Sequence, residues 1–123
     1  WRRVGEAATV SMILEFLVVN LLLKNWVARV RPYHLLEDLI LLVQEPADYS
    51  FPSGHTGAAF AVASVMFLGM PHSIGVPALI VASLIGFSRI YLGVHFPTDV
   101  LGGVVIGCAA GFVAWKLTGG KLR

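Results

Sequence analysis

Residues 50–70 read SFPSGHTGAAFAVASVMFLGM. It opens as a turn over residues 52–54 and then runs almost unbroken through apolar residues from position 58 to position 70. A histidine, His55, stands between the two parts. Turn formers before a long apolar run predict the start of a buried or membrane helix. A polar, titratable side chain at the start of such a helix calls for an explanation. Motifs elsewhere in the chain provide it.

The whole chain shares this apolar character. Of its 123 residues, 57% are hydrophobic and 13% are charged, and the mean hydropathy is +0.80. So few charges cannot cover so much apolar surface, which makes a bilayer the expected solvent. A net charge of +2 without a basic stripe indicates no nucleic-acid partner. The single cysteine, Cys108, excludes an internal disulfide and a cysteine-based metal site.

Four apolar stretches predict four membrane helices in one domain, residues 1–123. They cover residues 7–27, 56–70, 74–87 and 100–117. Only helices satisfy their own backbone in lipid, so we expect an all-α, polytopic membrane helix bundle. The polar connection of residues 31–53 contains the segment LLEDLILLV, which predicts a short helix lying on the membrane.

Alternating spans place the chemically interesting residues at one face, called the site side below. Its cations are Lys24, Arg29, Arg31 and Arg89. The opposite side carries Arg2, Arg3, Lys116, Lys121 and Arg123. Short flanks rich in Lys and Arg favour the cytoplasm, so we expect the site side to be extracytoplasmic.

Three separated groups of residues meet on the site side. In the first, Lys24 and Arg31 are seven residues apart, nearly two helical turns, so they share a helix face until Pro32 ends the helix. Alone, such a pair is often only two cations that extend into interfacial water.

The second group is the turn before residues 58–70. Ser53 can cap the helix and Gly54 allows an anion close to the free N–H groups of its first turn. The positive end of the helix dipole favours the same anion, with His55 beside it as a titratable group. Alone, the motif also fits a plain N-cap.

The third group is SRIYLGVHFPTD, residues 88–99. Pro97 suits the first turn of the last helix, and Asp99 can then reach back four residues to His95. A carboxylate on one ring nitrogen fixes the tautomer and leaves the other nitrogen as a nucleophile. The alternative is an ion pair of Asp99 with Arg89 beside a spectator histidine.

Taken together, the three groups predict a catalytic site for a phosphate or diphosphate. Ionisable groups near lipid are expensive and usually functional. Arginines and a lysine suit phosphoryl oxygens, and they supply charge stabilisation without a metal or another cofactor.

The order and spacing of these motifs resemble the type 2 phosphatidic acid phosphatase superfamily. The matching residues are Lys24-x6-Arg31-Pro32, Pro52-Ser53-Gly54-His55 and Ser88-Arg89-x5-His95-x3-Asp99. The resemblance implies a membrane phosphatase acting on phosphatidic acid, phosphatidylglycerol phosphate or undecaprenyl diphosphate. It also implies a six-helix core, of which this chain would be the C-terminal part, in a bacterial cell membrane.

The resemblance further implies residue roles. His95 would attack phosphorus to form a phosphohistidine, with Asp99 orienting its ring. His55 would protonate the leaving oxygen and later activate water. The phosphoryl oxygens would be held by Lys24, Arg31, Ser53, the Gly54 backbone and Arg89. Two alternatives stay open: a lipid-phosphate binding or transport module without catalysis, and a vanadate-dependent haloperoxidase, disfavoured because those enzymes are soluble.

Some residues fall outside these motifs. Two consecutive GxxxG steps, Gly103, Gly107 and Gly111, predict close helix packing, either inside the chain or with a second copy in a homo-oligomer. Glu15, in the middle of the first helix, is expected to face the bundle, protonated or hydrogen-bonded. His34 could line the substrate entrance.

Overall fold

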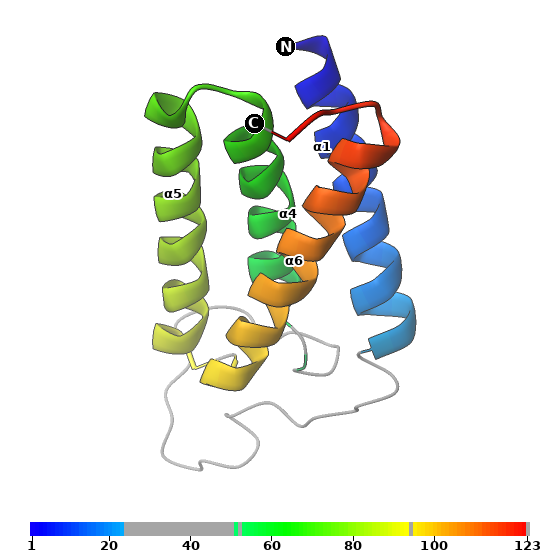
Figure 1. Cartoon of the computed structure of the whole chain (residues 1–123). Coiled ribbons are helices and arrows are strands. Elements are labelled where there is room, and N and C mark those ends of the chain that lie inside the picture. Colours follow the sequence, from blue (N-terminus) through cyan, green and yellow to red (C-terminus); the bar gives the residue numbers. More distant parts are fainter. Residues whose placement is uncertain (24–50, 52, 94, 123) are drawn as a thin grey trace.

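The computed structural model describes residues 1–23, 51, 53–93 and 95–122, and these residues are mainly helical (Figure 1). α1 (Arg2–Phe16) continues directly into a π-helical segment, η1 (Leu17–Leu23). The remaining helices are α4 (Gly54–Gly69), α5 (His72–Tyr91) and α6 (Pro97–Leu117). The all-helical prediction is confirmed for this part of the chain. The surface helix predicted over residues 35–43 lies outside it.

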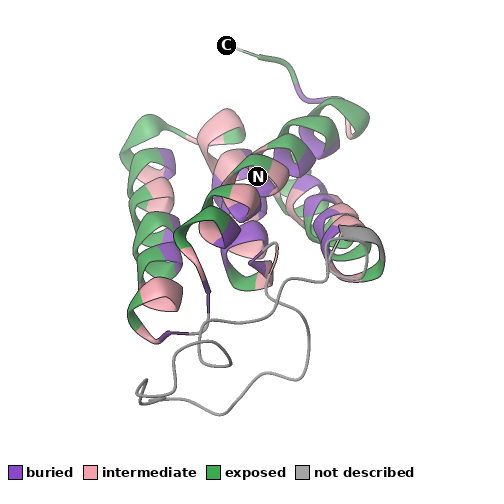
Figure 2. Ribbon diagram, turned by 90° about the horizontal axis from the view of Figure 1, so that it is seen from below, coloured by how far each residue is buried: buried purple, intermediate pink, exposed green. Residues whose placement is uncertain are grey.

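The helices run up and down, with α4 in contact with all the others (Figure 1). The largest contact is between α4 and α6, while α5 packs mainly on α4. Figure 2 shows buried residues on the inward faces and exposed residues on the outward faces. The outward residues are apolar: Leu84, Phe87, Leu101 and Val105 all keep more than 60% of their surface exposed. Hydrocarbon is the solvent that suits such a surface.

Among the described residues, three segments are long and apolar enough to cross a membrane: Arg2–Leu21, His72–Tyr91 and Pro97–Leu117. This agrees with an integral membrane protein. α4 is also apolar, but its 16 residues rise only about 24 Å, short of the ~20 residues that a span needs. The described part of each of the four predicted stretches forms a helix, and three of these helices qualify as spans. Residues 24–27 of the first stretch lie outside the described residues. The six-helix core stays a prediction.

The close approach of α4 and α6 depends on the three glycines of the GxxxG steps. A Cβ atom at Gly103 would lie 2.7 Å from the carbonyl oxygen of Ser53, and one at Gly111 would lie 2.8 Å from that of Ala61. Gly107 faces the Gly57 carbonyl in the same way. Because real Cβ contacts are not this short, only glycine allows the two backbones to meet. The partner of this motif in the structure is α4 of the same chain.

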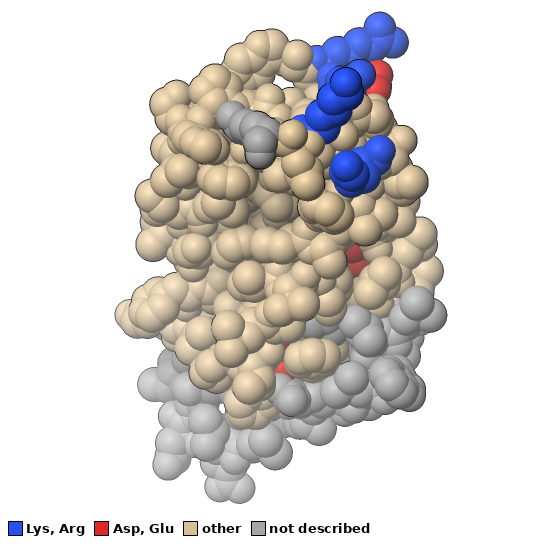
Figure 3. Space-filling view, viewed as in Figure 1, with Lys and Arg blue, Asp and Glu red and all other residues tan. Residues whose placement is uncertain are grey.

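The end of the bundle that holds both chain termini is basic. Arg2, Arg3, Lys116 and Lys121 gather there in Figure 3. Trp115 is buried beneath them against Ala7 and Val65. The second loop of the sequence, between α4 and α5, lies at this same end (Figure 1). The start of α4 and the connection from α5 to α6 lie at the opposite end, as the alternation of spans predicts.

Candidate active site

Three helix ends converge where the predicted site should be. The backbone N–H of Ser53, just before α4, donates to the carbonyl of Asp99, in the first turn of α6, at 3.0 Å. On α5, a Cβ at Gly86 would lie 3.0 Å from Val100 and 3.4 Å from Thr56, so this helix also comes close. The backbone hydrogen bond thus fixes the starts of α4 and α6 to each other, and α5 packs against side chains of both.

Ser53 caps α4. Its backbone is extended (φ −69°, ψ 114°), and its Oγ accepts a hydrogen bond from the Thr56 N–H at 3.3 Å. The same hydroxyl donates to Thr56 Oγ1 at 2.9 Å, and Ser53 is fully buried. Gly54 is the first residue of α4, so the helix begins with its free N–H groups and the positive end of its dipole at this point. The N-cap that the sequence predicts is present.

His95 and Asp99 form a buried pair. His95 is 4% exposed and Asp99 is fully buried. The His95 Nδ1 lies 3.6 Å from the Asp99 Oδ2, longer than a hydrogen bond but close enough for strong electrostatic coupling. That same Oδ2 accepts a 2.7 Å hydrogen bond from the Phe96 N–H, which fixes the carboxylate at the start of α6. Nδ1 is thus the ring nitrogen that faces the carboxylate, and Nε2 is the other ring nitrogen.

The turn before His95 depends on Gly93. Its φ of 76° lies in the left-handed region that glycine adopts readily, and it reverses the chain after α5. Arg89 stands in the last turn of α5, close to this reversal. Its Nε is buried and makes no hydrogen bond with any described residue. A buried guanidinium donor without an acceptor is costly, and an anion bound at this end of the bundle would satisfy it.

The structure therefore brings together Ser53, Gly54, His55, Arg89, His95 and Asp99 at one end of the bundle. His55 is the second residue of α4 and is exposed. The predicted phosphate ligands Lys24 and Arg31 lie outside the described residues, as does His34.

Two residues of this region were not predicted from the sequence. Thr56 holds the Ser53 hydroxyl, and the Ser-x-x-Thr spacing is a signal that could have indicated it. Gly86 allows α5 to approach, but one glycine in an apolar helix carries no such signal.

Glu15 faces the bundle, as predicted. It is 3% exposed, and its carboxylate lies directly against Gly57, so that a Cβ atom there would contact Oε1. Gly57 is two residues after His55 on α4. The carboxylate thus lies next to the first turn of α4, close to the candidate site.

Comparisons with known proteins agree with this geometry. The family model of the PAP2 superfamily matches residues 6–123. The chain is 32% identical over 116 residues to an undecaprenyl-diphosphatase of Sulfolobus acidocaldarius, covering 94% of this chain and 56% of that protein. It is 42% identical over 100 residues to phosphatidylglycerophosphatase B of Bacillus subtilis, covering 73% and 46%.

A solved structure shares the fold. The crystal structure of Aquifex aeolicus LpxE superimposes with a TM-score of 0.84 at 38% identity, over 94% of this chain and 68% of that one. The chain spans about half the length of the curated relatives named above. The family resemblance inferred from the three motifs is confirmed by these matches. The chain belongs to the PAP2 superfamily.

Proposed function

We propose that this chain carries the active site of an integral-membrane phosphatase that hydrolyses a lipid phosphate or diphosphate. The observation that carries the proposal is the buried His95–Asp99 pair, held beside the N-terminus of α4 by the Ser53–Asp99 backbone hydrogen bond. This arrangement sets a nucleophile next to an anion-binding helix end. The names of the relatives, a diphosphatase and a phosphatidylglycerophosphatase, support the same substrate class.

The proposed reaction has two steps. His95 Nε2 attacks phosphorus, and an N–P bond forms while the P–O bond to the lipid breaks. The Asp99 carboxylate stabilises the positive charge that develops on the ring, and His55 gives its proton to the leaving oxygen. His55 then takes a proton from water, which attacks phosphorus, breaks the N–P bond and releases inorganic phosphate.

The phosphoryl oxygens need donors that are already in place. Within the described residues these are the first N–H groups of α4, beginning at Gly54, and the guanidinium of Arg89. The Ser53 hydroxyl can take part only by exchanging its hydrogen bond to Thr56. By the family resemblance, Lys24 and Arg31 complete the set.

Location and assembly extend the proposal. We place the protein in a bacterial cell membrane with the site facing the extracytoplasmic side, because the basic end of the bundle favours the cytoplasm. Phosphatidic acid, phosphatidylglycerol phosphate and undecaprenyl diphosphate are the candidate substrates. Homo-oligomer formation through Gly103, Gly107 and Gly111 stays a prediction, since within one chain these glycines face α4.

Phosphate release by the detergent-purified full-length protein, assayed in EDTA with these three lipids, tests the proposal. We expect release from at least one lipid, and complete loss in His95→Ala. His72→Ala is the matched control, because His72 is exposed at the opposite end of the bundle and stacks on Phe67. It should keep wild-type activity. No release from any lipid would favour the binding or transport module, and equal activity of both variants would remove His95 as the nucleophile.

A further inference from the structure

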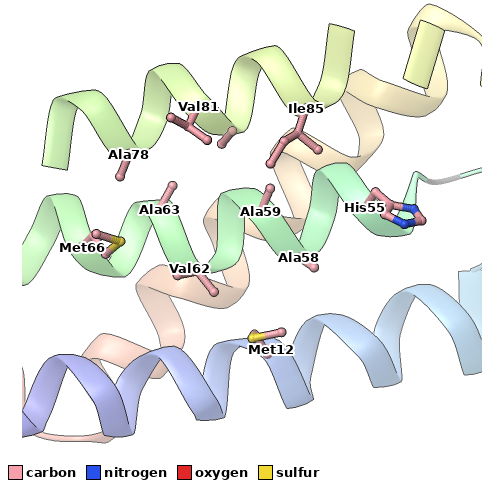
Figure 4. Close-up of a pocket in the computed structure, with 11 residues that line it drawn as sticks. Met12, His55, Ala58, Ala59, Val62, Ala63, Met66, Ala78, Val81 and Ile85 are labelled. Atoms are coloured by element: carbon pink, nitrogen blue, oxygen red, sulfur yellow. The ribbon is translucent and has the colours of Figure 1, made fainter. Parts of the chain in front are cut away.

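An apolar groove runs along α4 between α1 and α5, and it begins at His55 (Figure 4). Its volume is about 520 Å³. Every described side chain that lines it is alanine, valine, isoleucine or methionine, with the single exception of His55. The groove is therefore suited to hydrocarbon along its length and to a polar group at one end only.

Small side chains keep the groove open. In Figure 4, Ala59 and Ala63 on α4 lie opposite Ala78 and Val81 on α5, and Met12 on α1 faces the other flank of α4. Ala63 and Ala82 belong to one buried cluster, with Ala59 and Ala78 packed against it. The small alanine methyl groups keep this contact shallow, so the groove lies along its edge.

The dimensions favour one extended chain as the occupant. From His55 to Met66 is eleven residues, or about 16 Å along α4. Dividing the volume of about 520 Å³ by this length gives a cross-section of roughly 32 Å². A helix with its side chains is about 10 Å across, or roughly 80 Å², so a helix can cover the groove but cannot fill it.

We propose that this groove receives one hydrocarbon chain of the lipid substrate. The inference rests on the proposed function and names the part of the protein that recognises the lipid beyond its phosphate. His55 is the proposed proton donor to the leaving oxygen, and that oxygen is the atom that joins the phosphate to the rest of the lipid. A groove that begins at His55 therefore begins where the lipid chain leaves the reacting centre.

The groove acts on orientation more than on affinity. A chain that moves from the bilayer into the groove was never in water, so it gains little hydrophobic free energy. What it gains is a fixed direction, which holds the leaving oxygen at His55. Misplacement of reacting atoms by about 1 Å can cost on the order of 10²-fold in rate. Changes in the groove should thus alter the hydrolysis rate of long-chain substrates and should not alter that of short, water-soluble phosphate esters.

Two variants that narrow the groove test this in the full-length protein. Val62→Phe and Ala78→Leu both change half-buried lining residues, and Ala109→Leu on the exposed face of α6 is the matched control. The substrates are the lipid from which the wild type releases phosphate in the assay above and an analogue of that lipid with a four-carbon chain. We expect the groove variants to lose up to about 10²-fold in kcat/KM on the long substrate and nothing on the short one. The control should match wild type on both.

The outcomes separate the two proposals. If both substrates are affected equally, or neither is, the groove does not receive the chain, although the phosphatase function stands. If the wild type releases phosphate from none of the three candidate lipids, the proposed function fails, and this inference, which rests on it, fails too.

A second measurement does not depend on how the variants fold. A lipid substrate with a diazirine about 16 Å from the phosphate along its hydrocarbon chain is photolysed on the wild-type protein, and the labelled residues are mapped. We expect label near Met66 and Ala78, at the end of the groove away from His55. Label spread evenly over the exposed α6 residues Leu101 and Val105, or confined to them, would overturn the inference.

Discussion

Asp99 Oδ2 accepts a hydrogen bond from the Phe96 N–H and also faces His95 Nδ1. One oxygen atom thus accepts a hydrogen bond that caps the first turn of α6 and also supplies the negative charge beside the proposed nucleophile. The two tasks are separable by chemistry, because a cap needs only an acceptor whereas the imidazolium that develops during attack needs a charge. The site and the helix that carries it are coupled through this single side chain.

Asp99→Asn and Asp99→Ala should separate these tasks. Asparagine keeps an acceptor for the Phe96 N–H, so we expect Asp99→Asn to melt near the wild-type temperature. Loss of the charge beside a histidine costs up to about 10⁴-fold in kcat in a serine protease triad, and we expect a loss on the order of 10²–10⁴-fold here. Asp99→Ala should lose the same activity and about 1 kcal/mol of stability besides.

Phosphate-release kinetics and thermal unfolding in detergent measure the two effects. Wild-type turnover by Asp99→Asn would show that the carboxylate serves the helix alone.

Much of the site could be predicted residue by residue because its contacts are local in sequence. The Ser53 cap and the approach of Asp99 to His95 follow from spacings of three and four residues at helix starts. The contact of Glu15 with Gly57 does not, because it depends on how α1 and α4 are placed. Sequence indicated only that a carboxylate in lipid must face inward.

At the level of helices, the same limit applies to the glycines of α6. Their spacing of four residues predicts a flat helix face that suits close packing. The spacing does not indicate which helix packs against that face. The structure assigns α4. The π-helical turn of η1 was also beyond prediction, since the apolar run LVVNLLL has the same pattern in an α-helix or a π-helix.

Gly107→Ala should lower both the stability of the protein and the activity of the site, although Gly107 lies outside the site. Its Cβ would meet the Gly57 carbonyl and lie 2.9 Å from the Phe60 Cβ, so α6 must move away from α4. We expect a loss of about 1–3 kcal/mol in stability, as for overpacked cores. We also expect reduced kcat, because the Ser53–Asp99 hydrogen bond spans the same two helices.

The matched control is Gly5→Ala on α1, where a Cβ atom meets nothing within 4 Å. Alanine at an open helical position should stabilise by up to about 1 kcal/mol and leave kcat unchanged. Thermal unfolding and turnover measurements on both variants test this prediction. A Gly107→Ala protein as stable and active as wild type would contradict the packing argument.

For the molecule as a whole, the arrangement of charge along the bundle sets the expected orientation. The exposed sides of the helices are apolar, and the described lysines gather with Arg2 and Arg3 at the end that holds both termini. α4 rises less than a bilayer core, but it contacts every other described helix, so much of its length is covered by protein rather than lipid. Composition predicted the membrane, but only the packing shows why one helix can be short.

Cysteine labelling in intact cells tests this orientation. In a background with Cys108→Ala, Tyr91→Cys places a thiol at the site end, where Tyr91 is 72% exposed. Ser73→Cys places one at the basic end, in the exposed first turn of α5. A membrane-impermeant maleimide should label Tyr91→Cys in intact cells and Ser73→Cys only after permeabilisation. The reverse pattern would put the site in the cytoplasm, where a lipid phosphate of the inner leaflet, rather than a carrier released outside, would have to be the substrate.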